Sequence, residues 1–274
     1  MRKTYKTWAQ YRGRASSLLK RFFGFRRPRN DRNWSLDLKI LPEIILSDDH
    51  TITIKNIRNF SYQSVQKYTP KYYDRTFPLT EIRDVWFLVE PFSWLAAHTM
   101  LSFGLYDGTY ISVSVEIRKK IGQRFSQFAT LFFLRRHELV YVIGDEQDLI
   151  KLRTNYREDK TYLYPMTLSS GEAQQLFVDT LKRAQYIQEN PEFYNPFTNT
   201  CLTNLIDHIN AVRMTHIPLS YKMWVAKYAD VLMYEEGLID QSLPFVDIQK
   251  KYFINERAHR HAVDPDFSKK IRTI

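Results

Sequence analysis

Hydrophobic and polar residues alternate along much of the first two thirds of the chain. Short runs with this two-residue period, rich in β-branched and aromatic residues, are typical of strands that bury one face. Seven such runs are predicted as strands: residues 51–57, 85–89, 97–105, 110–117, 138–143, 149–153 and 161–168.

Helical periodicity replaces this alternation after residue 168. Ser169 and Glu172 fit a capping box, and apolar residues then recur at helical spacing until Asn190-Pro191 ends the pattern. A second helix is predicted from Cys201 to about Val212, followed by short helices and loops. Strands grouped before helices indicate an α+β domain whose sheet is antiparallel.

Residues 97–119 predict a hairpin around Asp107-Gly108. A three-residue loop from Tyr106 to Gly108, with Gly108 in the left-handed conformation, gives one clean apolar face (Thr99, Leu101, Phe103 and Leu105 with Ile111, Val113, Val115 and Ile117). A two-residue loop would mix apolar and polar side chains on both faces, so the three-residue register is favoured.

The other face of this hairpin carries small and polar residues, with His98 directly across from Glu116. Cross-strand neighbours have Cβ atoms roughly 5 Å apart. A carboxylate beside an imidazole orients the ring and stabilises its protonated form, so the pair is a candidate for acid–base chemistry. An ordinary His–Glu pair on a solvent-facing sheet is the alternative.

Cys201 is the single cysteine of 274 residues, which excludes an internal disulfide. The preceding Thr198, Asn199 and Thr200 suit a helix cap, which places the thiol in the first helical turn. The helix dipole there favours thiolate, and the free N–H groups of that turn suit a developing oxyanion. A buried helix residue without chemistry is the alternative. A cysteine at a helix start with a histidine and a polar orienter is the papain-type arrangement, here in permuted order because His98 and Glu116 precede Cys201.

The net charge of +10 is confined to the start of the chain. Residues 1–34 hold 11 Lys or Arg and one acid, so residues 35–274 are neutral overall. Aromatic and aliphatic residues are interleaved with these basic ones, which favours a helix lying on an anionic membrane surface. A solvated leader and an RNA-binding tail are the alternatives. We therefore divide the chain into a tail, residues 1–34, and one domain, residues 35–274.

Several function classes are disfavoured by the sequence. It contains neither GxGxxG nor GxxxxGK[ST], and its histidines lie outside any acidic or cysteine cluster at metal spacing. We expect no cofactor, no metal and no nucleic acid partner for the domain. No apolar run reaches the roughly 18–20 residues of a membrane span, and no signal peptide is evident.

Six segments together resemble the Lnb-type N-terminal periplasmic domain family, over residues 30–271: NDRNW (30–34), IKNIRNFSY (54–62), AAHTMLSFGLYDGTYISVSVEIRKK (96–120), ELVYVIGDEQDLIKLRTNYR (138–157), PEFYNPFTNTCLTN (191–204) and DFSKKIR (266–272). Around the cysteine, TNTCLTN departs from the expected TNNCTTN. The resemblance implies a circularly permuted papain-like, NlpC-like fold on the extracytoplasmic, periplasmic side of a membrane.

The resemblance also implies a cysteine-dependent acyltransferase or thioesterase that moves fatty acyl chains of lipids or bacterial lipoproteins. Cys201 would be the nucleophile and acyl carrier, His98 the general base and acid, and Glu116 the orienter. A thiol peptidase or amidase acting on cell-wall peptides, and a non-catalytic membrane-surface module, are the other hypotheses.

Four further residues are candidates for substrate binding. Arg118 follows Glu116 on the same polar face and suits a lipid phosphate, although an ion pair at the hairpin end is equally compatible. Ser102 lies on that face too, while Tyr194 and Asn199 precede the cysteine and would line its pocket; loop packing and helix capping are the alternative roles for those two.

Overall fold

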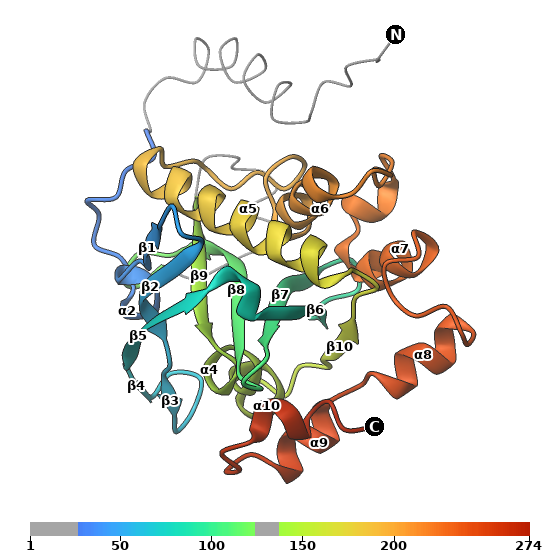
Figure 1. The fold of residues 1–274 in the computed structure, drawn as a ribbon. Coiled ribbons are helices and arrows are strands. Elements are labelled where there is room, and N and C mark those ends of the chain that lie inside the picture. The colour runs from blue at the N-terminus through green and yellow to red at the C-terminus, as the bar shows by residue number, and fades with distance from the viewer. Residues whose placement is uncertain (1–26, 124–136) are drawn as a thin grey trace, which may run out of the picture.

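The computed structural model describes residues 27–123 and 137–274. One large sheet separates two layers of helices (Figure 1). Eight strands form the sheet in the order β1-β2-β9-β8-β7-β6-β10, with β5 also paired to β2. Their bounds are β1 Glu43–Leu46, β2 Thr51–Arg58, β5 Tyr72–Pro78, β6 Ile82–Pro91, β7 Ala97–Leu105, β8 Tyr110–Arg118, β9 Glu138–Asp145 and β10 Tyr162–Pro165. A separate ribbon pairs β3 (Ser61–Tyr62) with β4 (Tyr68–Thr69).

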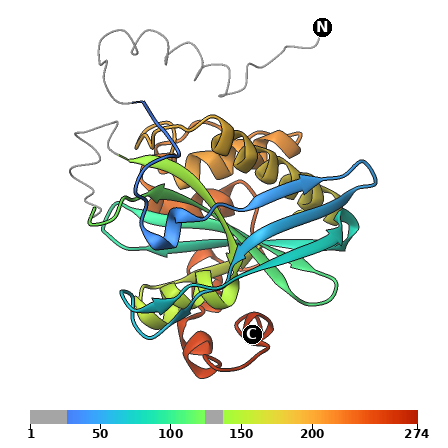
Figure 2. The ribbon, with the colours of Figure 1, turned by 90° about the vertical axis from the view of Figure 1, so that its left-hand side faces the viewer.

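The helices lie on both faces of this sheet, as the side view in Figure 2 shows. Their bounds are α2 Leu36–Lys39, η1 Leu79–Glu81, α4 Glu146–Lys151, η2 Leu152–Tyr156, α5 Ser170–Glu189, α6 Cys201–Val212, η3 Tyr221–Met223, η4 Ala226–Tyr228, α7 Ala229–Glu235, α8 Phe245–Lys251, α9 Asn255–Arg260 and α10 Phe267–Lys270. All strand pairs of the large sheet are antiparallel except β2 with β9, which meet in parallel at Arg58 and Gly144. The predicted α+β class is confirmed, and the permuted papain-like topology stays a prediction.

The β7–β8 hairpin has the predicted register. Leu101 pairs with Val113 and Gly104 with Tyr110, and Gly108 closes the three-residue loop with φ +83°. Its apolar face packs with α5 and α6 in the main core. Its polar face is not solvent-facing, because α4 and its neighbours cover it and leave Ser102, Ser112 and Ser114 fully buried.

The two predicted helix starts are confirmed in detail. Ser169 accepts from the Glu172 N–H while the Glu172 carboxylate bonds back to the Ser169 N–H. Thr200 and Thr203 form the same reciprocal cap at the start of α6. The long helix α5 stops at Asn190, as the following proline predicts.

The strand predicted at residues 149–153 is wrong, because this segment is the helical stretch α4–η2. Asp145 caps that helix by accepting from the Gln147 N–H, a local signal that outweighs the β-rich composition. The helix reads as a strand because both of its sides are buried, between the sheet and the C-terminal helices. Strands β1 and β5 were missed: β5 buries only Phe77 among its seven residues, so its apolar alternation is weak.

The boundary after residue 34 falls inside the folded body. Trp34 is buried, forms a β-bridge with Lys120 and stacks on the Arg118 guanidinium at 4.4 Å. Arg32 and the Arg29 N–H both contact the Glu138 carboxylate, at 2.8 and 3.1 Å. The domain therefore includes residues 29–34. The predicted interfacial helix falls largely on residues 1–26, which lie outside the described residues.

Candidate active site

The β7–β8 hairpin opens into a fork at its end distant from the turn. The ladder stops at Met100 and Ser114, although the same register would pair His98 with Glu116. Beyond that point β7 stays paired with β6 as far as Ala97, and β8 stays paired with β9 as far as Arg118. The two strands thus remain ordered but separate, which leaves room for side chains between them.

Ser114 links the imidazole to the carboxylate in this fork. The Ser114 hydroxyl lies 2.7 Å from His98 Nε2 and donates to Glu116 Oε1 at 2.7 Å, while the direct separation of Nε2 from Oε1 is 3.3 Å. Because the hydroxyl proton is used on Glu116, Ser114 accepts from His98, which assigns the ring proton to Nε2. The lone pair of Nδ1 is then unprotonated, and within the described residues no hydrogen bond reaches that atom.

Arg153 contacts Glu116 from the helical layer formed by α4 and η2. Its guanidinium donates to Glu116 Oε1 at 2.8 Å and to the Leu149 carbonyl at 2.6 Å, and it forms an ion pair with Glu90 at 2.7 Å. Arg153 and Glu90 are both almost fully buried. Burial raises the pKa of Glu90 to about 7 against the lowering effect of Arg153.

The surroundings keep His98 neutral and Glu116 ionised. Burial, aided by the charges of Arg153 and Arg157, lowers the pKa of His98 to about 4 against the raising effect of Glu116. Burial raises the pKa of Glu116, but His98, Arg153 and the Ser114 hydrogen bond outweigh it and bring that pKa well below its usual value. At neutral pH the His98 ring is therefore a neutral imidazole, oriented through Ser114 by the ionised Glu116 carboxylate.

Cys201 occupies the first position of α6, which packs on β7. Burial raises the pKa of its thiol, and the nearby charge of Glu116 raises it further, against the lowering effect of the Thr99 hydroxyl and N–H and of the Leu202 N–H. The thiol is thus protonated at rest, next to Thr99 and within electrostatic reach of Glu116. Among the described residues the buried Thr99 hydroxyl has no partner other than the sulfur, so it can donate to a thiolate.

The thiol and the imidazole lie on opposite faces of β7, at the adjacent residues Thr99 and His98. Side chains of successive strand residues point to opposite faces, so Thr99 faces α6 and His98 faces the Ser114–Glu116 side. Across residues 27–123 and 137–274 no hydrogen bond joins Cys201 to His98. The predicted Cys201–His98–Glu116 set therefore has its His–Glu part assembled and its thiol at the same strand end.

Tyr194 and Asn199 lie at the thiol side. Tyr194 packs partly buried against the main core, and both burial and the proximity of Cys201 raise the pKa of its phenol. Asn199 donates to Glu192 and to the Phe193 carbonyl, each at 3.0 Å, and accepts from Asn204. Tyr194 thus lies close to the thiol, whereas the hydrogen bonds of Asn199 stabilise the turn that precedes Cys201.

Ser102 and Arg118 are not part of this site. Ser102 is fully buried and donates to Glu146, which is ion-paired with Arg272. Arg118 is buried under Trp34, and its three nitrogens donate to Asn30 and to the carbonyls of Leu38 and Lys39. Their polar atoms are therefore engaged within the fold, and the substrate-binding roles expected for both stay predictions.

The buried His98 should make stability depend on pH. An unfolded histidine takes up its proton near its ordinary pKa of 6.5, whereas folded His98 does so only near 4. The folded state therefore loses stability as pH falls between these values, by on the order of 3 kcal/mol. Urea unfolding between pH 6.5 and 4 should show a steeper loss for the wild type than for His98→Gln; parallel profiles would contradict this.

Comparison with known families establishes the family of this chain. The model of the Lnb N-terminal periplasmic domain matches residues 68–227, which include the hairpin, the fork and Cys201. The chain belongs to this family. No curated protein and no solved structure matches it. Membership in a periplasmic domain family supports an extracytoplasmic location for this Lnb domain. Along the part of the chain that the structure describes, none of the helices has the length and apolarity required to span a bilayer.

Proposed function

We propose that this Lnb domain is a thiol-dependent acyltransferase that moves a fatty acyl chain of a lipid or lipoprotein through a thioester on Cys201. The observation that carries the proposal is the fork, where the helix-start thiol contacts Thr99 while the adjacent residue of β7, His98, has its Nε2–H fixed by Ser114 and Glu116. That arrangement leaves Nδ1 as a free base, which is what a protonated thiol requires.

The reaction has two acyl-transfer steps, and in each of them a proton passes through His98. Cys201 Sγ attacks the ester carbonyl while its proton passes to His98 Nδ1, and the C–O bond then breaks as that proton goes to the leaving alkoxide. An acceptor amine next attacks the thioester, the C–S bond breaks, and the amine proton returns to the thiolate through His98. Because thiol and ring lie on opposite faces of β7 at rest, this proton transfer requires the end of the strand to rearrange when substrate binds.

Backbone groups at the start of α6 suit the tetrahedral intermediates. Thr203 N–H is used in the cap, whereas Cys201 N–H, at the first helical position, has no intrahelical acceptor. Such a group, with the positive end of the helix dipole, stabilises an oxyanion. The Thr99 hydroxyl is placed to stabilise the departing thiolate.

The proposal is tested by intact-mass measurement after incubation with a diacyl phospholipid or a diacylated lipopeptide at mildly acidic pH. A hydroxylamine-labile acyl adduct on the wild type, absent from Cys201→Ala, is the expected result. No adduct together with a Cys201 unreactive to iodoacetamide in the folded state would overturn it. No adduct with a hyper-reactive Cys201 would instead favour a thiol peptidase or amidase.

A further inference from the structure

The loop between β6 and β7 exposes three large apolar side chains a few residues before the fork. Trp94 is 77% exposed, and Phe92 and Leu95 are each 43% exposed. This loop runs directly into His98. Side chains of this size exposed together on a folded domain mark an interaction surface.

The segment that holds η3 and η4 adds aromatic side chains beside that loop. Tyr221, Trp224 and Tyr228 are 61%, 51% and 39% exposed, and the Tyr221 and Tyr228 rings are 6.4 Å apart. The Lys227 N–H contacts the Leu95 carbonyl at 3.5 Å, which joins the segment to the loop. Two segments distant in sequence therefore form one surface.

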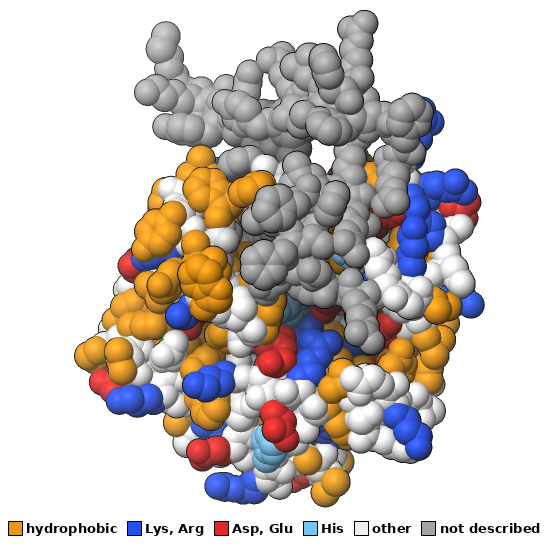
Figure 3. Space-filling view, turned by 180° about the vertical axis from the view of Figure 1, so that it is seen from behind, with side chains coloured by type: hydrophobic (Ala, Val, Ile, Leu, Met, Phe, Trp, Pro, Cys, Tyr) orange, Lys and Arg blue, Asp and Glu red, His pale blue; other side chains and the backbone are white. Residues whose placement is uncertain are grey.

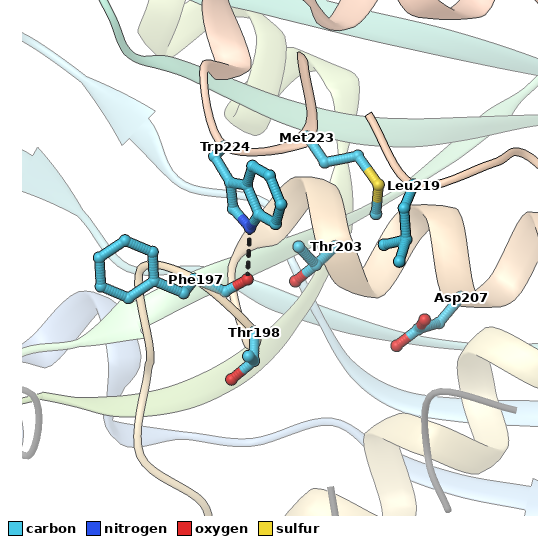
Figure 4. A pocket seen from close by; sticks show the side chains of 7 residues that line it. All are labelled: Phe197, Thr198, Thr203, Asp207, Leu219, Met223 and Trp224. Carbon is cyan, nitrogen blue, oxygen red and sulfur yellow. Dashed lines mark hydrogen bonds between the residues drawn. The ribbon is translucent and has the colours of Figure 1, made fainter. Parts of the chain in front are cut away.

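The same surface continues to the turn before Cys201. Trp224 donates its indole N–H to the Phe197 carbonyl at 3.0 Å, and Phe197 is half exposed. Figure 4 shows Trp224, Phe197, Leu219 and Met223 around a hollow that also meets Thr203 in the first turn of α6. We define the aromatic face as Trp94, Leu95, Phe197, Tyr221, Trp224 and Tyr228.

Basic residues predominate in the segment that carries most of the aromatic face. From His208 to Ala229 the chain carries Arg213, Lys222 and Lys227 and not one Asp or Glu. Lys227 is exposed, with its ammonium 5.8 Å from the Tyr228 ring. Figure 3 shows hydrophobic side chains gathered on the side of the molecule that bears α6 and α7 in Figure 1.

We propose that the aromatic face docks on the surface of an anionic phospholipid bilayer. Trp and Tyr place their apolar rings among acyl chains and their polar groups among head groups, and interleaved Lys side chains meet anionic lipids. Asp207 lines the hollow and Glu235 pairs with Lys222, so Lys227 is the exposed cation of this surface that would meet an anionic head group. The inference adds a partner to the proposed acyl transfer, since docking would bring Cys201 next to membrane lipids.

The test uses the full chain carrying Cys201→Ala, so that binding is read without turnover, and Trp8→Phe, so that the tail contributes no indole signal. Vesicles of phosphatidylethanolamine and phosphatidylglycerol are compared with phosphatidylcholine vesicles by co-sedimentation. Adding Trp94→Ala and Trp224→Ala should weaken binding to the anionic vesicles about tenfold, because both side chains leave the acyl region. The matched control is Tyr106→Ala, an exposed aromatic residue at the opposite end of β7.

Acyl chains brominated near the head group provide a second reading. Trp34 is buried, and Trp86 packs under the Arg272 guanidinium against the second core cluster. Insertion of the aromatic face should therefore appear as quenching that Trp94→Phe with Trp224→Phe removes and Tyr106→Ala leaves intact. Equal vesicle binding by all variants, or quenching that survives loss of both tryptophans, would overturn the proposal in favour of attachment through residues 1–34. A dimer in solution that the Trp94→Ala and Trp224→Ala changes convert to monomer would overturn it in favour of a second copy. None of these readings depends on an acyl adduct, so failure of the proposed chemistry remains distinguishable.

Discussion

Replacing His98 with glutamine should slow acylation of Cys201 by about 10²- to 10⁴-fold. The glutamine amide fills similar space and hydrogen-bonds with Ser114, but it cannot accept the thiol proton. The thiol pKa is raised by burial, so uncatalysed ionisation is rare at neutral pH and the loss of a base is fully felt. The rate of thioester formation in a single turnover, followed by intact mass, measures the effect.

Two further variants serve as comparisons for His98→Gln. Ser114→Ala leaves the ring in place but removes the link from His98 to Glu116, so its rate should fall less, by about tenfold, with an altered pH profile. His261→Gln, a partly exposed histidine far along the chain, should have no effect. If His98→Gln acylates within threefold of wild type, while its melting temperature is unchanged, another group is the base.

Replacing Arg153 with leucine should destabilise the fold by about 3–5 kcal/mol. Arg153 is fully buried and neutralises two carboxylates, and its removal leaves Glu90 buried and Glu116 without its guanidinium partner. Arg157→Leu is the matched control: its guanidinium lies 3.7 Å from Glu90 but is 38% exposed, so its loss should cost under about 1 kcal/mol.

Urea unfolding at neutral pH measures both variants. Adding Glu90→Gln to Arg153→Leu should recover part of the lost stability, because a neutral amide is less costly to bury than an unpaired carboxylate. Equal costs for the Arg153 and Arg157 variants would show that the buried ion pair does not dominate this side of the sheet.

The hairpin was predictable because alternation has a period of two, so a register slip would have exposed its entire apolar face. The same rule predicted that His98 and Glu116 share a face. It did not predict Ser114 as the link between them, because periodicity gives the face of a side chain and not its rotamer. The signal was present, since Ser114 precedes Glu116 by two residues on the same strand.

The fork and the lower helical layer were beyond the sequence pattern. Strand pairing was expected to continue through His98. Residues 97–99 and 115–117 contain no proline, glycine or turn motif that would predict the end of the ladder. Arg153 fell in a segment assigned to a strand, so its position beneath Glu116 was hidden by that error. Cys201 at a helix start was predictable from its caps, whereas its contact with Thr99 depends on how α6 packs across β7.

The docked segment at residues 29–34 bears on how the chain is shortened for study. The segment contacts Arg118, the last residue of β8, and Glu138, the first residue of β9. It therefore connects, like a clasp, the ends of two neighbouring strands. Trimming the whole basic stretch through Trp34 would remove the Trp34 ring and the Asn30 acceptor from Arg118, and the Arg29 and Arg32 partners from Glu138. A loss of solubility or activity after such trimming would report an opened clasp, and says nothing about whether the basic stretch binds a membrane.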